Sequence, residues 1–338
     1  MTFDQFLPVL FWLLMGLAML VYVVLDGYDL GVGMLLPLGQ GDAERDTMVS
    51  SIGPFWDANE TWLVLGVGLL LVAFPKAQGV ILGALYLPVT LMLLGLILRG
   101  VAFDFRVKAR ADHKPLWNRL FFVGSVLASV AQGWMLGRYV MGLGESAADY
   151  AFSTLIALTL PVSYVLLGAC WLILKTEGGL QRRAVVWAKR AWPAMLLGLA
   201  LVSVATPLIS TTVRERWFSF PNILALLPVP LMSGLALVAL RGLLNSHRIV
   251  GAAPGEGKLC WLPLTLAISV MLVGGLGLAY SLYPYVLLDR LDVWQTAAAP
   301  GSLKILLAGA AVSLPAIGLY TVFVYRVFGG KAKALSYA

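Results

Sequence analysis

The sequence predicts an all-α membrane protein that crosses the bilayer nine times. Of its 338 residues, 60% are hydrophobic and only 12% are charged, which leaves too little polar surface to cover a soluble globule. The mean hydropathy of +0.88 is typical of the same class. The apolar residues form continuous runs of roughly 20 residues, the length of a helix that spans the hydrocarbon layer. A membrane β-barrel would instead show short alternating segments.

The nine expected spans follow one another with short connections. They cover residues 6–28, 54–74, 79–103, 119–141, 151–174, 191–212, 221–244, 260–284 and 303–326. The second and third spans are divided at Pro75 and Lys76, which favour a turn over a kink that would leave eight spans. Because the connections are too short to fold alone, residues 1–338 are expected to form a single transmembrane domain.

The distribution of lysine and arginine predicts the orientation in the membrane. With the N-terminus outside, 18 of the 24 Lys and Arg residues fall in inner loops and inner helix ends, and 6 fall on the outer side. Cytoplasmic loops carry an excess of these residues, so the C-terminus is expected in the cytoplasm. The net charge of +7 is explained by these loops, and no nucleic-acid partner is expected.

Ionisable residues gather at one end of the first three spans. The first span ends in LDGYDLGVG, the second begins with GPFWDANETW, and the third ends in LRGVAFDFR. Because consecutive spans cross in opposite directions, these three motifs are expected at the same membrane face. Intramembrane carboxylates are costly and mark functional sites by default, and an arginine is their natural counter-ion. The motifs contribute Asp26, Asp29, Asp57, Glu60, Arg99 and Asp104.

The spacing of these residues is compatible with more than one function. Embedded carboxylates and ordered water can relay protons, which suits proton handling on the cytoplasmic face. The acids and Arg99 can equally form an ion-pair network that holds three helices together, as a purely structural scaffold. A proton-coupled secondary transporter would also place acids in the membrane. Such transporters often show inverted repeats and broken helices at the midplane, whereas here the charges lie at one face.

The chain offers few groups that could hold a redox centre. Its two histidines, His113 and His247, fall in basic inner loops, whereas an embedded haem usually needs an axial histidine. Cys170 and Cys260 show no metal-ligand spacing, and no phosphate loop, nucleophile elbow or zinc motif occurs. We therefore expect no catalytic residue, metal site or haem in this chain, so any redox centre would belong to another subunit.

At DGYDLGVG, GPFWDANETW and LRGVAFDFR the sequence resembles subunit II of the cytochrome bd-type quinol:oxygen oxidases. The three motifs occur in the order and spacing of that family, and the likeness is concentrated in the first third of the chain. The resemblance implies the fold of the family, two four-helix bundles plus one peripheral helix. The relatively short length and the WDANETW form are similar to the cyanide-insensitive branch.

This resemblance implies a haem-free partner of a homologous subunit I in the bacterial inner membrane, with the N-terminus in the periplasm. Subunit I would carry two b-type haems and a haem d, or a third haem b. The complex would oxidise ubiquinol or menaquinol and reduce dioxygen to water with cytoplasmic protons. The family also makes a structural quinone, a small accessory subunit and membrane lipids candidate partners.

The resemblance assigns roles to the motif residues as well. Asp57 corresponds to the acid after the tryptophan of WDxN, which is associated with proton uptake towards the oxygen site. Trp62 is similar to a tryptophan at the lipid-side entrance of an oxygen tunnel. The remaining ionisable residues would hydrate and tune the proton pathway: Asp26, Asp29, Glu60, Arg99 and Asp104. Two more residues support the motif, Trp56 and Asn59.

Overall fold

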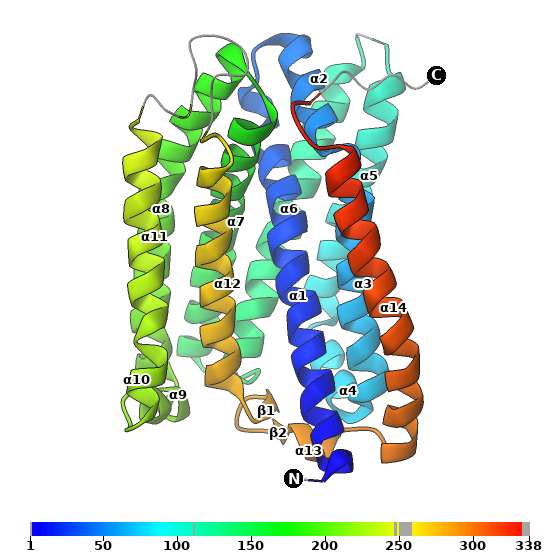
Figure 1. The fold of residues 1–338 in the computed structure, drawn as a ribbon, viewed down its shortest axis with the longest axis vertical. Coiled ribbons are helices and arrows are strands. Elements are labelled where there is room, and N and C mark those ends of the chain that lie inside the picture. The colour runs from blue at the N-terminus through cyan, green and yellow to red at the C-terminus, as the bar shows by residue number, and fades with distance from the viewer. Residues whose placement is uncertain (1, 111, 247–248, 250–258, 333–338) are drawn as a thin grey trace.

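The computed structural model describes residues 2–110, 112–246, 249 and 259–332. Long helices run side by side along the longest axis of the molecule, and short elements close one end (Figure 1). His247, one of the two histidines considered for haem binding, lies outside the described residues. So do three of the Lys and Arg residues counted for the orientation, Arg248, Lys258 and Lys333.

The described chain is built almost entirely of α-helices. They are α1 Phe3–Leu35, α2 Gly41–Ile52, α3 Trp56–Ala73, α4 Pro75–Ala84, α5 Tyr86–Lys108, α6 Lys114–Val140, α7 Ala147–Lys175, α8 Gly178–Ile209, α9 Thr211–Trp217, α10 Asn222–Leu226, α11 Pro228–Leu244, α12 Leu262–Leu282, α13 Val293–Thr296 and α14 Pro300–Val327. A short 3-10 helix, η1 Leu36–Leu38, follows α1, and two antiparallel strands follow α12, β1 Tyr285–Leu287 and β2 Leu291–Asp292. Capping boxes at Thr2 and Ser146 begin α1 and α7.

The expected nine spans are confirmed within the described residues. Eight helices are long and apolar enough to cross a membrane, and α3, bent by 44° from the preceding polar α2, supplies the ninth. Pro75 begins α4 at a position where its missing N–H costs nothing, which separates α3 from α5. Two boundaries differ from the expectation. The first helix continues to Leu35 because its carboxylates are buried between helices, and the third expected span is divided at Leu85 into α4 and α5.

By their contacts, the spans are described as two groups of four with one helix outside them. The first group is α1, α3, α5 and α6, and the second is α7, α8, α11 and α12. The groups meet where α1 and α6 pack against α7. The last helix, α14, lies on the outside of the first group, against α3 and α1. This is the expected plan of two four-helix bundles with a peripheral helix.

Glycine allows helices to approach closely, both between the two groups and within the first group. A Cβ atom on Gly31 of α1 would lie 1.8 Å from the backbone oxygen of Tyr164 on α7, so no larger residue fits there without separating the helices. A Cβ atom on Gly124 of α6 would similarly lie 2.6 Å from the backbone oxygen of Gly95 on α5. The backbones therefore pack in direct contact, and the side chains around these glycines are fixed.

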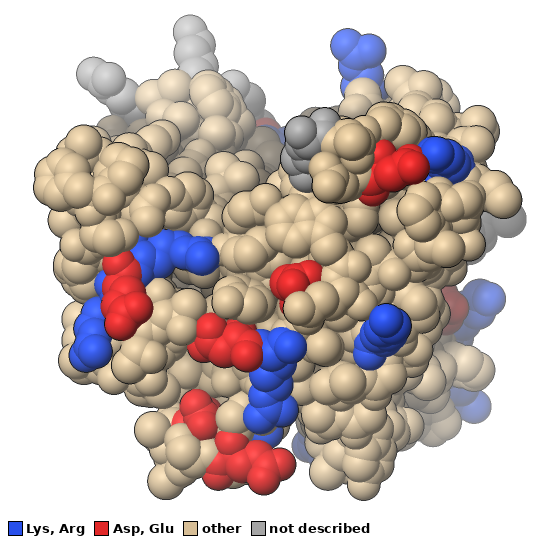
Figure 2. Space-filling model, turned by 90° about the horizontal axis from the view of Figure 1, so that it is seen from below, with Lys and Arg blue, Asp and Glu red and all other residues tan. Residues whose placement is uncertain are grey.

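The two ends of the molecule differ. We call them the α2 end, where α1 finishes and α3 begins, and the N-terminal end (Figure 1). At the N-terminal end, β1, β2 and α13 close the bundle, and the Trp12 indole N–H donates to the backbone oxygen of Tyr285 at 3.1 Å. Figure 2 shows acidic and basic side chains as small neighbouring groups on this surface. One such pair joins Lys304 to Asp4 at 2.8 Å.

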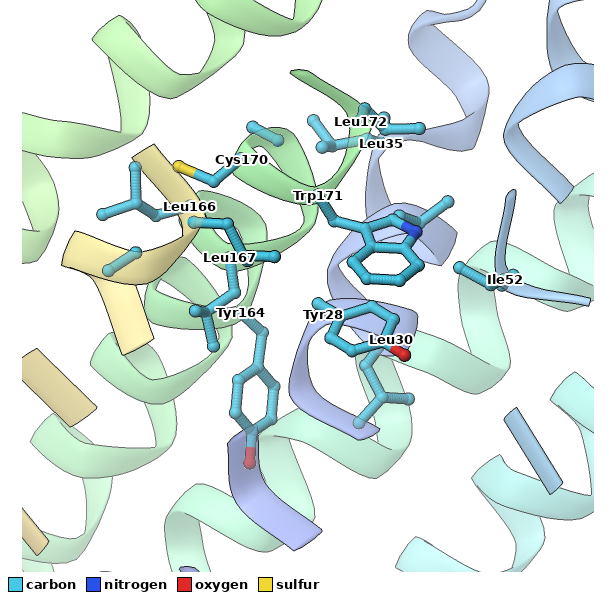
Figure 3. Packing of buried hydrophobic residues seen from close by; sticks show 14 of the residues in the cluster. Tyr28, Leu30, Leu35, Ile52, Tyr164, Leu166, Leu167, Cys170, Trp171 and Leu172 are labelled. Carbon is cyan, nitrogen blue, oxygen red and sulfur yellow. The ribbon is translucent and has the colours of Figure 1, made fainter. Parts of the chain in front are cut away.

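The core near the α2 end is aromatic. The ring of Tyr28 stacks on that of Trp171 with centroids 4.0 Å apart (Figure 3). Phe55, which immediately precedes α3, meets Trp171 edge-on at 5.3 Å. All three side chains are buried. These contacts hold the Tyr28 ring in place beside the first turn of α3.

Candidate functional site

Arg99 lies at the centre of a buried charged group between α1, α3 and α5. Its Nη1 donates to Asp26 Oδ1 at 2.5 Å, and its Nη2 donates to Glu60 Oε1. Arg99 and Asp26 are almost fully buried, whereas 27% of the Glu60 side chain is exposed. The planar fork of one guanidinium therefore binds carboxylates from two other helices. We call Asp26, Asp29, Glu60 and Arg99 the acid cluster.

Asp29 belongs to this cluster but forms no ion pair with a described residue. It lies one turn after Asp26 on α1 and is fully buried. Its Oδ2 accepts a hydrogen bond from Asn59 Nδ2 at 2.8 Å, and its Oδ1 has no hydrogen-bond partner among the described residues. Both donor arms of Arg99 are directed at the other two acids. Three carboxyl groups thus share one guanidinium.

Two sets of neutral groups surround the cluster. On one side, Tyr164 donates to Gln132 Oε1 and Gln132 Nε2 donates to the Tyr22 hydroxyl, both at 2.7 Å. Tyr22 lies close enough to interact with Asp26, whose Oδ2 has no partner among the described residues. On the other side, Asn59 is hydrogen-bonded to the hydroxyls of Tyr28 and Tyr325. The polar region therefore extends from α1, α3 and α5 to α6, α7 and α14.

Sequence reasoning missed the four tyrosines and Gln132. The tyrosines carried no signal, because aromatic residues are common in membrane helices and few of them serve a site. Gln132 did carry one, since an uncharged polar side chain in the middle of the apolar span 119–141 must find a partner. That partner lies on other helices, which the local sequence does not reveal.

Asp57 and Asp104 lie at the α2 end, as expected, but outside the cluster. Both residues are exposed, and neither forms an ion pair with a described residue. Asp57 is one turn before Glu60 on α3, so it adjoins the partly exposed member of the cluster. The structure thus brings four of the six expected ionisable residues into contact and places the other two on the surface of this chain.

The two motif tryptophans occupy different positions. Trp62 is buried against α14, where its indole N–H donates to Thr321 Oγ1 at 3.3 Å. Trp56 packs against Phe103 with ring centroids 5.5 Å apart. The rings of Trp56 and Phe103 line a gap beside Arg99 that is too narrow to hold a water molecule. The cluster is therefore closed on this side.

A second polar contact anchors α2 to the bundle. Asp46 of α2 pairs with Arg106 Nη1 at 2.6 Å and with Lys114 at 3.1 Å. Arg106 is itself buried, and its Nε donates to Asn118 Oδ1 on α6 at 2.5 Å. This group shares no residue with the acid cluster, and its ion pairs join the polar helix α2 to α5 and α6.

Comparison with known proteins identifies the chain. The family model described as cytochrome bd terminal oxidase subunit II matches residues 7–328. The chain belongs to the cytochrome bd terminal oxidase subunit II family. It is 28% identical to cytochrome bd-I ubiquinol oxidase subunit 2 of Escherichia coli K12, over 96% of this chain and 95% of the relative. It is 33% identical to cytochrome bd ubiquinol oxidase subunit 2 of Bacillus subtilis 168, over 58% and 60%.

The fold is similar as well. The bd oxidase of Geobacillus thermodenitrificans superposes with a TM-score of 0.70 at 16% identity, covering 96% of this chain and 98% of the other. The bd oxidase subunit II described here is thus a multi-pass inner-membrane protein and part of a respiratory oxidoreductase, and the resemblance seen in its three motifs is confirmed. Its family name implies a subunit I as partner.

Metal-ligating side chains are not gathered together in the described residues of this bd oxidase subunit. These residues contain no group of three or more His, Cys, Asp and Glu side chains placed to hold a metal. His113 lies directly before α6 with 67% of its side chain exposed, outside the packed bundle. The expectation that this chain ligates no haem stays a prediction.

Proposed function

We propose that this subunit stabilises a haem-bearing subunit I and supplies it with protons from the cytoplasm. Subunit I would hold two b-type haems and a haem d, or a third haem b, and the complex would oxidise ubiquinol or menaquinol and reduce dioxygen to water. The names of the relatives as ubiquinol oxidases support this reaction. The observation that carries the proton role is the buried carboxyl group of Asp29, which forms no ion pair with a described residue.

Charge counting supports Asp29 as the group that binds and releases a proton. If all three carboxyls were ionised, Arg99 would leave the buried cluster with two excess negative charges, which is costly in an apolar medium. Arg99 binds the other two carboxylates directly and stabilises their ionised forms. Asp29 accepts a single hydrogen bond from a neutral amide. Protonation at Asp29 therefore relieves excess charge without breaking an ion pair.

Protons would pass between Asp29 and the surface of the chain through Glu60 and Asp57, carried by ordered water between the carboxyl groups. Asp57 is exposed at the α2 end, Glu60 is partly exposed one turn further along α3, and Arg99 holds Glu60 beside the buried Asp26 without itself giving up a proton. This order makes Asp57 the inner proton-pathway acid. Asp104, exposed on α5 at the same end, would hydrate the entrance, and Trp56 and Asn59 would support it. The α2 end then faces the cytoplasm, with the N-terminus in the periplasm.

The face that carries Asp57 is proposed to contact subunit I. The outward surface of α3 is otherwise apolar, with Val64 71% exposed and Val72 51% exposed. A carboxylate on such a surface is costly against lipid and acceptable against a protein partner that offers polar groups. The buried Trp62, between α3 and α14, is proposed to border a path for oxygen. A structural quinone, a small accessory subunit and lipids remain candidate partners.

A purely structural role is the second candidate. The contacts of Arg99 with Asp26 and Glu60 tie α1, α3 and α5 together, which a scaffold would also require. A transporter role is set aside, because the chain belongs to an oxidase family.

Conservative variants of the assembled oxidase separate the two candidates. Asp29→Asn and Asp57→Asn should each slow oxygen reduction, on the order of 10²-fold for loss of a proton-transfer group, while the haem content per complex stays normal. Asp42→Asn, at an exposed acid on α2, is the matched control and should behave as wild type. Loss of haem-loaded complex in the Asp29 and Asp57 variants would support the scaffold instead, and normal turnover in both would contradict the proton pathway.

A further inference from the structure

Tyr325 of the last helix reaches into the acid cluster. Most of α14 is not buried within this chain, and its buried residues are Leu303, Ala310 and Val324. The Tyr325 hydroxyl donates to Asn59 Oδ1 at 3.1 Å and is hydrogen-bonded to the Tyr28 hydroxyl. Asn59 in turn donates to Asp29. The peripheral helix α14 therefore contacts Asn59, which is hydrogen-bonded to Asp29.

Counting hydrogens shows that Tyr28, Asn59 and Tyr325 form a closed ring. Each phenol has one hydrogen to donate, and an amide group has two on nitrogen and none on oxygen. The hydrogen of Tyr325 goes to Asn59 Oδ1, and one amide hydrogen goes to the Tyr28 hydroxyl at 2.8 Å. Tyr28 is left to donate to Tyr325, which closes the ring. The second amide hydrogen points to Asp29 Oδ2 at 2.8 Å, with a longer contact to the backbone oxygen of Leu25 at 3.4 Å.

The aromatic core holds this ring in place. Tyr28 is stacked on Trp171, and Tyr325 packs on Phe55 with ring centroids 4.7 Å apart. Lys175 at the end of α7 donates to the backbone oxygen of Phe328 at 2.7 Å, which fixes the end of α14 three residues after Tyr325. Both phenol rings are therefore positioned independently of their hydroxyl groups. Removal of one hydroxyl should leave the packing intact.

We propose that Tyr325 is a positioning residue for proton transfer at Asp29. Through the ring it turns the N–H side of the Asn59 amide towards the Asp29 carboxyl, which favours release of the proton. Without the Tyr325 hydroxyl, Asn59 Oδ1 loses its donor, and the amide can turn its oxygen to accept the carboxyl hydrogen, which favours retention of the proton. This inference rests on the proposed role of Asp29. The other titratable or charged groups around Asp29 are Asp26, Tyr28, Glu60, Arg99 and Tyr325 itself.

The test uses the assembled oxidase and reads the carboxyl group directly. Tyr325→Phe removes the hydroxyl and keeps the ring. Tyr320→Phe makes the same change at a tyrosine of α14 that is 54% exposed and outside the ring, so it is the matched control. Infrared difference spectra would record the carbonyl stretch of protonated carboxyl groups, with Asp29→Asn identifying the Asp29 band. Oxygen consumption and haem content are measured on the same samples.

The expected result is a displaced Asp29 band and an about tenfold slower turnover in Tyr325→Phe, the effect of one lost hydrogen bond to a charged group, at normal haem content. Tyr320→Phe should match wild type in both. An unchanged band in Tyr325→Phe, or equal changes in the two variants, would overturn the inference. If Tyr325→Phe does not assemble, Tyr28→Phe decides, because it opens the same ring and should displace the same band. If Asp29→Asn removes no band and leaves turnover normal, the proposed function fails rather than the ring.

Discussion

Arg99 donates from its two terminal nitrogens to Asp26 and Glu60, which lie on different helices. Replacement of Arg99 by Met would leave both carboxylates buried or half-buried without their cation. Breaking such a buried pair costs about 3–5 kcal/mol, so we expect little haem-loaded complex in membranes, measured from the haem absorbance per unit of membrane protein. Arg99→Lys should recover part of it, because an ammonium keeps the charge and loses the planar fork. Normal assembly of Arg99→Met would contradict the central role of this side chain.

Gln132 should stabilise the fold without serving turnover directly. Gln132→Leu leaves the Tyr22 and Tyr164 hydroxyls without the amide between them, and each buried unsatisfied group costs about 1–3 kcal/mol. The melting temperature of the purified complex should fall, as followed by thermal unfolding in detergent. Tyr164→Phe, which removes only one hydroxyl, should lower it less. Equal melting temperatures for wild type and Gln132→Leu would show that these contacts contribute nothing.

Gly31 should be irreplaceable, whereas Gly16 on the same helix should not be. Gly31→Ala places a methyl group on the Tyr164 backbone oxygen and forces α1 away from α7, which we expect to cost about 1–3 kcal/mol. Nothing lies within 4 Å of the corresponding position at Gly16, so Gly16→Ala should be neutral or slightly stabilising. The yield and melting temperature of the complex measure both. A pair of variants that behave alike would contradict the close packing of α1 on α7.

The orientation can be measured with single cysteines. Glu145→Cys lies in the exposed turn between α6 and α7, and Asp42→Cys lies in the first turn of α2, at opposite ends of the bundle. In intact cells, a thiol reagent that does not cross the membrane should label the cysteine at position 145. The cysteine at position 42 should react only after permeabilisation. The reverse pattern would mean that the α2 end faces the periplasm, away from the cytoplasmic protons.

Much of the architecture could be predicted from local sequence. Apolar runs defined the spans, and Pro75 marked the division between α3 and α5, because proline and length act locally. The end of α1 was wrong by several residues. The first span is expected to end at residue 28, near the membrane interface, whereas the burial of Asp26 and Asp29 among neighbouring helices lets the helix continue to Leu35. That burial depends on α3 and α5, which a pattern within one span does not encode.

The site was predictable in its location and only partly in its contacts. The i,i+3 spacing on α1 and the alternation of spans correctly placed the six ionisable residues at one end. Neither feature gives the rotation of a helix about its axis, so the exposure of Asp57 and Asp104 could not be foreseen. The contact from Tyr325 to Asn59 joins residues 266 positions apart, and nothing in the apolar sequence of the last span indicates it.

The position of Tyr325 also bears on how the protein is made. α14 leaves the ribosome after α1 and α3, and it carries the hydroxyl that closes the ring around Asn59. Until that helix has inserted, Asn59 lacks one of its partners and the acid cluster is open on the α14 side. The surroundings of Asp29 are therefore complete only after α14 has inserted, and a chain truncated before α14 would lack the Tyr325 contact at this site.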